Sequence, residues 1–70
     1  TIRYGIREQG HIEITIYNVL GRQVTTLVDG RVTAGWHEVR WDASRNASGV
    51  YIAVLDHQDR RVSHQMLLIK

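Results

Sequence analysis

Strict alternation of apolar and polar side chains is the feature that most constrains the fold of this chain. Between residues 11 and 17, isoleucine stands at every even position, and His, Glu, Thr and Tyr stand at the odd ones. A period of two is typical of a β-strand that buries one face, and no segment shows the 3.6-residue period of an amphipathic helix. Similar segments recur along the chain at residues 1–6, 22–28, 36–41, 50–55 and 60–69. Short strands at this spacing predict an all-β sandwich or small barrel with six to seven antiparallel strands.

The phase of the alternation predicts which side chains form the core. The inward set is Ile12, Ile14, Ile16, Val39, Trp41, Val50, Ile52 and Val54. His37 is in phase with Val39 and is expected to be half-buried, whereas Trp36 is expected to face outward. Trp41 contributes the largest apolar surface of the set, so we expect it to fill the core.

Turn-forming residues separate the predicted strands. Asn18 and Gly21 suit the first and last positions of a type I turn, which predicts a hairpin between residues 12–17 and 22–28. Asp29-Gly30 predicts a further turn, Ala34-Gly35 a break, and residues 56–59 the turn before the last strand. We expect Asp42 to bind the backbone of the polar loop that follows it, and Gly49 to permit the turn into the next strand.

Size and charge limit the class of protein. Seventy residues make a single domain, residues 1–70, and a core of this size rarely supplies more than about 3–5 kcal/mol. The chain has no cysteine and a net charge of +2, with Arg60-Arg61 as its largest basic cluster. We therefore expect neither disulfides nor a nucleic-acid footprint, and no apolar run is long enough to span a membrane. Thr1 is no initiator methionine, so we interpret the chain as a domain excised from a larger secreted protein.

No arrangement of reactive side chains predicts catalysis, a metal site or a cofactor. Ser48 could act as a nucleophile only with a histidine base and an orienting acid, and no spacing joins His37 and Asp42 to it. Four histidines occupy different predicted elements, with no spacing typical of metal ligands: His11, His37, His57 and His64. We therefore expect a protein that is no enzyme.

The order and spacing of these motifs resemble a known family. The motif residues are Tyr17, Asn18, Gly21, Gly35, His37, Trp41, Asp42, Gly49 and Tyr51, followed by the closing run Gln65, Met66, Leu67, Leu68, Ile69 and Lys70. Over essentially its whole length the chain resembles a C-terminal sorting domain of the type IX secretion system, type A. It is also similar to the immunoglobulin-like domain of flagellar hook-capping proteins.

The resemblance implies an immunoglobulin-like β-sandwich without catalytic function at the C-terminus of a secreted protein such as a hydrolase. The outer-membrane type IX machinery would read it as an export signal. A sortase-like protease could then remove it and attach the cargo to surface lipopolysaccharide, or the domain could stay as a tether. The chain would be exported to the bacterial outer surface or beyond, and residues 65–70 would form its recognition tail.

Three residues depart from the family pattern. Arg7 stands where proline is frequent, Ala43 where glycine often follows Trp-Asp, and Gln65 where a lysine usually precedes the methionine. Gln65 lies in the tail and is the departure that would weaken an export signal.

Two alternatives remain open at this point. Trp36, together with Tyr17 or Tyr51, could form a sugar-stacking platform in an accessory carbohydrate-binding module. The chain could also be a structural immunoglobulin-like spacer or assembly domain. The apolar residues 67–69 predict a central strand, and an edge strand offered to a receptor is the alternative.

Overall fold

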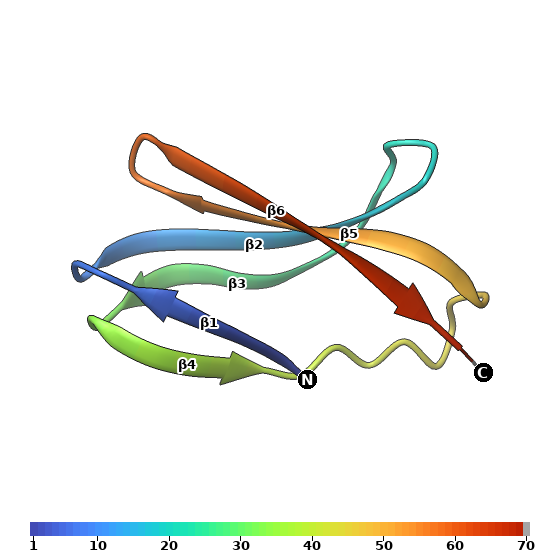
Figure 1. Cartoon of the computed structure of the whole chain (residues 1–70), viewed down its shortest axis with the longest axis horizontal. Helices are drawn as coiled ribbons and strands as arrows, with labels where there is room; N and C mark the ends of the chain where they lie inside the picture. Colours follow the sequence, from blue (N-terminus) through green and yellow to red (C-terminus); the bar gives the residue numbers. More distant parts are fainter. Residues whose placement is uncertain (70) are drawn as a thin grey trace.

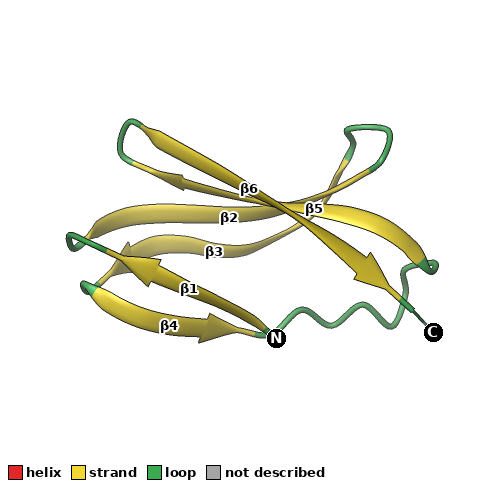
Figure 2. Cartoon of the chain, in the orientation of Figure 1, coloured by secondary structure: helices red, strands yellow, loops and turns green. Residues whose placement is uncertain are grey.

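The computed structural model describes residues 1–69 and is entirely built of β-strands and their connections (Figures 1 and 2). In chain order the strands are β1 (Ile2–Ile6), β2 (Gly10–Asn18), β3 (Gln23–Val32), β4 (Gly35–Val39), β5 (Gly49–His57) and β6 (Arg60–Leu68). Within the described residues no helix is long and apolar enough to cross a membrane.

The strands form two sheets, and all their pairings are antiparallel. One sheet has four strands in the order β3-β2-β5-β6, and the other contains β1 and β4. The two sheets enclose the apolar side chains of β1 and β2, as expected of an immunoglobulin-like sandwich. The predicted fold class is confirmed, with six strands in the part of the chain that the structure describes.

The turn between β2 and β3 is built around Asn18. Its backbone carbonyl accepts the N–H of Gly21 at 3.0 Å, and its side-chain Oδ1 accepts the N–H groups of Leu20 and Arg22, both at 3.0 Å. Gly21 has a φ of +79°, a conformation that costs glycine little and other residues more. The turn and hairpin predicted from these residues are confirmed.

The turn predicted at Asp29-Gly30 is wrong. β3 continues through both residues to Val32, with Gly30 opposite Ile12 and Asp29 opposite Glu13. β2 is long enough to pair with the whole segment, so regular hydrogen bonding to a neighbouring strand outweighs the local turn preference.

The core consists of two adjoining clusters. Ile6, Ile12 and Ile14 form one of them. Ile16, Tyr51 and Ala53 form the other. Ile12, Ile14 and Ile16 are each at most 1% exposed, as predicted. Val39 and Trp41 are half-buried and pack on the rims of the two clusters.

The predicted phase of β5 is wrong. Tyr51 and Ala53 face the core, whereas Val50, Ile52 and Val54 are half-buried on the outer face of the four-stranded sheet. β5 is apolar on both faces, so its own hydrophobicity does not distinguish them. The pairing with β2 determines which face of β5 is buried, because Ala53 lies opposite the buried Ile16 and therefore points to the same face of the sheet.

The last strand lies at the edge of its sheet. Among the described residues β6 pairs with β5 and with no further strand, so the predicted central strand is wrong and β6 is an edge strand. Met66 and Leu68 pack against the core, while Leu67 on the other face is 68% exposed. An apolar run therefore occurs here in a strand that, among the described residues, has a neighbour on one side only.

Candidate recognition surface

The closing residues of the chain divide into anchored and displayed side chains. Met66 lies opposite Tyr51, and Leu68 lies opposite Gly49. Both pack against the cluster that contains Ile16 and Tyr51. These two anchors hold the end of β6 on the sandwich.

The displayed side chains are Gln65, Leu67 and Ile69, which we call the tail surface. Gln65 lies opposite the outward-facing Ile52, and Leu67 lies opposite the outward-facing Val50. Leu67 and Ile69 are 68% and 78% exposed. Lys70, the last predicted tail residue, lies outside the described residues. The tail surface thus places two large apolar side chains beside the unpaired edge of β6.

The other predicted motif residues build the fold around this edge. Tyr51 Oη donates a hydrogen bond to the carbonyl of Ala47 at 2.7 Å. Its ring packs edge-to-face on Trp41, with 5.1 Å between the ring centroids. The carboxylate of Asp42 accepts the N–H of Ser44 at 3.1 Å, the loop bond expected of it. Gly49 has a φ of +154°, which lets the chain enter β5.

His37 and Gly35 stabilise the small sheet. His37 Nε2 lies 2.7 Å from the carbonyl oxygen of Thr33, and the imidazole stacks on the Tyr4 ring at 5.5 Å. Burial of Tyr4 beside this stack raises the pKa of its phenol. Gly35 begins β4 with a φ of +124°. His37 is half-buried, as predicted from its phase.

Electrostatics near the β5–β6 turn come from one close ion pair. Arg61 Nε donates to the Asp56 carboxylate at 2.8 Å, which raises the pKa of Arg61 above its already high ordinary value. Both side chains are solvent-exposed to a large extent, so this pair adds little to stability.

Comparison with family models supports one of the interpretations left open by the sequence. The model described as "Secretion system C-terminal sorting domain" matches residues 1–70. The chain belongs to this family. No curated protein and no solved structure matches it.

The sorting domain is a non-catalytic C-terminal signal for type IX secretion. Membership in the family implies that it engages the type IX machinery, that cargo precedes it in the same protein, and that this protein is secreted.

The sorting domain does not bring together the aromatic residues of the sugar-platform hypothesis. Trp36 is 71% exposed on the outer face of the β1–β4 sheet, as predicted, and its ring covers Gly5. Tyr51 is buried in the core, and Tyr17 lies on the outer face of the other sheet, opposite Ile52. The Arg3 guanidinium lies 5.1 Å from the Trp36 ring centroid. Trp36 therefore stands apart from both tyrosines.

The histidines of the sorting domain are also dispersed, on β2, β4, β5 and β6. His11 pairs with the Asp29 carboxylate at 2.8 Å. Within residues 1–69 no three metal-binding side chains gather at one place.

Sequence reasoning missed a groove between β1 and β6. Its volume is about 430 Å³, and its lining comes from the end of β1 and from the β5–β6 hairpin. The alternation along β6 was the available signal. Val62 and His64 lie on the same face of the strand as the anchors Met66 and Leu68, but they are exposed whereas the anchors are half-buried.

Proposed function

We propose that the type IX machinery recognises this sorting domain through the tail surface and the unpaired edge of β6. The observation that carries the proposal is the exposure of Leu67 and Ile69 at 68% and 78%, directly beside that edge. A free strand edge supplies backbone N–H and C=O groups for a receptor strand, and alternate side chains supply specificity.

The anchors explain why folding and recognition must be separated in any test. Met66 and Leu68 pack on the core, so removal of residues 66–70 would take away part of the sandwich together with the signal. Leu67 and Ile69 make far less contact with the core, and their replacement is expected to leave the fold intact.

The finer biology is proposed from the family resemblance. The cargo is a secreted protein such as a hydrolase, joined to the N-terminal side of residues 1–70. After export, a sortase-like protease removes the domain and the cargo is attached to surface lipopolysaccharide, which places it on the bacterial outer surface.

The experiment uses a fluorescent reporter fused to the sorting domain in a host that has type IX secretion. Leu67→Ser combined with Ile69→Ser should retain most of the reporter in the periplasm, whereas the parent fusion reaches the surface or the medium. Trp36→Thr is the matched control, because it removes a side chain of similar exposure, 71%, from the other sheet. It should be exported like the parent.

Thermal unfolding of each purified domain shows whether the variants are folded. Lys70→Ala, tested in the same assay, asks whether the end charge contributes. Equal export of the parent and the folded tail-surface variant would refute the proposal, and a structural spacer would then be the better account. If only the Trp36→Thr variant loses export, the recognition site lies on the small sheet instead.

A further inference from the structure

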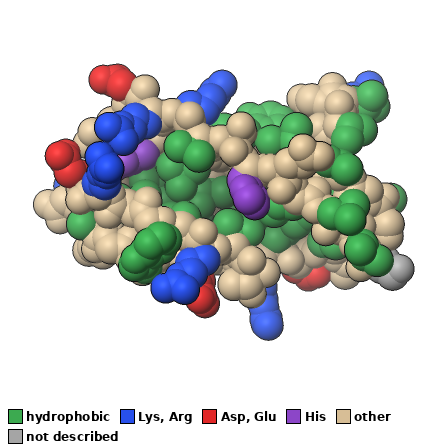
Figure 3. Space-filling view, viewed as in Figure 1, with side chains coloured by type: hydrophobic (Ala, Val, Ile, Leu, Met, Phe, Trp, Pro, Cys, Tyr) green, Lys and Arg blue, Asp and Glu red, His purple; other side chains and the backbone are tan. Residues whose placement is uncertain are grey.

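The core-facing side of β6 is only partly covered. Val62 lies opposite Leu55 and therefore faces the interior of the sandwich, yet it is 60% exposed. The cause is the size of the second sheet, because β1 and β4 together do not reach across the four-stranded sheet to β6. Figure 3 shows hydrophobic side chains across the middle of this open side, with charged side chains at one end and along the rim.

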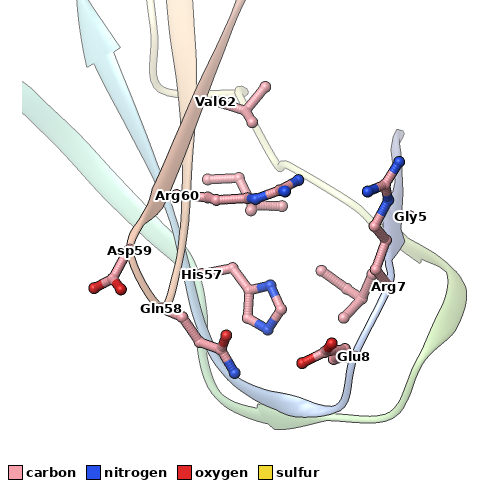
Figure 4. A pocket seen from close by; sticks show the side chains of 10 residues that line it. Gly5, Arg7, Glu8, His57, Gln58, Asp59, Arg60 and Val62 are labelled. Atoms are coloured by element: carbon pink, nitrogen blue, oxygen red, sulfur yellow. The ribbon is translucent and has the colours of Figure 1, made fainter.

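The free edge of β1 borders the opening. Residues 5–8 form one wall of the groove, and Leu55, His57, Arg60 and Val62 form much of the opposite side. No residue of β4 lines it, so the groove lies on the side of β1 that faces away from β4 (Figure 4). Within residues 1–69 β4 is the one neighbour of β1, so the backbone groups along its second edge pair with no strand.

His57 adds a polar group to the groove. Its ring stands in the groove between the two walls, while its Nε2 atom is buried and has no hydrogen-bond partner (Figure 4). That atom lies over Gly10, 3.3 Å from where a Cβ would be. A buried polar atom without a hydrogen-bond partner is costly. The imidazole is therefore a polar group available to a segment that enters the groove.

The charges of β1 indicate what kind of strand fits. Its outward positions carry Arg3 and Gly5, followed by Arg7, and the existing neighbour β4 places Glu38 opposite Arg3. Opposite charges across a strand pair are stabilising and like charges are not. A second copy of β1 would bring the arginines of both copies onto one face, which disfavours self-pairing. Glu8 and Asp59 lie at the far end of the groove, near the two turns.

We propose that one extended segment of a partner protein, with alternating apolar and acidic side chains, pairs with the free edge of β1 as the third strand of the small sheet. Its apolar side chains cover Leu55 and Val62, and its acidic side chains lie beside Arg3 and Arg7. The interaction is separate from the tail surface and does not rest on the export role.

The test titrates the isotope-labelled domain with a capped peptide of the sequence Glu-Val-Glu-Val-Glu-Val and follows the backbone amide signals. We expect the largest shifts at Ile2–Ile6 and around Val62. A Lys-Val-Lys-Val-Lys-Val peptide should bind at least about ten-fold more weakly, because it repels the arginines. A Glu-Val peptide N-methylated at alternate residues on its pairing edge should not bind, because it cannot donate to the edge of β1.

Two neighbouring substitutions provide the matched control. Val62→Asp places a carboxylate in the groove and should abolish binding, whereas Ser63→Asp places the same charge on the outer face of β6 and should leave binding unchanged. Both positions are exposed, so both variants should fold, and their amide spectra check this.

Three outcomes would overturn the proposal: no binding of the acidic peptide, equal loss in both aspartate variants, or shifts confined to the outer edge of β6. Dimerisation of the domain alone, with shifts at β1, would show that a second copy occupies the edge and would likewise reject it. A domain that binds the peptide while export is unaffected by the tail-surface variant would reject the proposed function and leave this inference standing.

Discussion

Tyr51 is expected to be the most sensitive position of β5, which tests the observed phase of that strand. Its ring is 7% exposed, packs edge-to-face on Trp41 and lies opposite the anchor Met66. The sequence pattern instead predicts the neighbouring Val50 as the buried residue. Replacement of Tyr51 and of Val50 by alanine therefore distinguishes the two phases directly.

The magnitudes follow from burial. Removal of a buried aromatic ring costs about 3–5 kcal/mol, of which an edge-to-face pair accounts for roughly 0.5–1.5 kcal/mol. The core of so small a domain supplies about 3–5 kcal/mol in total, so Tyr51→Ala should be largely unfolded. Tyr51→Phe removes only the hydrogen bond to Ala47 and should cost about 1 kcal/mol. Val50→Ala, on the half-buried outer face, should also cost about 1 kcal/mol.

Urea denaturation followed by tryptophan fluorescence measures these differences. With a urea dependence of about 1 kcal/mol per molar for a small domain, Tyr51→Phe should lower the midpoint by about 1 M. Tyr51→Ala should show no folded baseline. If Val50→Ala unfolds the domain while Tyr51→Ala is tolerated, the assigned phase of β5 and the core built on it are wrong.

Three further predictions concern the turns and the small sheet. Asn18→Ala leaves two backbone N–H groups without their acceptor and should lower the free energy of unfolding, measured by urea denaturation, by about 1 kcal/mol. An unchanged midpoint would show that water fully replaces the side chain as acceptor. Gly49→Ala should cost about 1–2 kcal/mol because of its positive φ, whereas Gly30→Ala, with open space around it and no positive φ, should match the parent or exceed it slightly. Equal loss in the two glycine variants would contradict this reasoning. Burial raises the pKa of Tyr4, so the unfolded chain loses the phenol proton at a lower pH than the folded domain, and the free energy of unfolding should fall as pH rises above about 10. Tyr4→Phe should lose less stability at alkaline pH. Identical pH profiles of the two proteins would refute the assignment.

Much of the fold could be predicted because local signals and tertiary packing agree. In β2, the isoleucines at 12, 14 and 16 alternate with polar residues, so the pattern indicates which face of the strand carries the apolar core. In the β2–β3 turn, Asn18 and Gly21 have side-chain and backbone properties that suit few other structures. Both were predicted correctly for these reasons.

The errors occur where the local signal is absent or is outweighed. β5 is apolar on both faces, and its phase depends on the register with β2, which no local pattern encodes. Asp29-Gly30 has a turn composition, yet a long neighbouring strand keeps it extended. The tail residues were identified through family resemblance, and their division into anchors and displayed side chains required the structure.

The pairing of the first strand with the fourth also sets an order of folding. The β2–β3 and β5–β6 hairpins join neighbouring segments and can form early. The pairing of Ile2 with Val39 closes a much longer loop, which contains the β2–β3 hairpin, and is therefore slower. The small sheet is therefore expected to close last and to open first. Until it closes, the isoleucine face of β2 stays in contact with water, so a chain that emerges slowly during transport carries an aggregation-prone surface until β4 is complete.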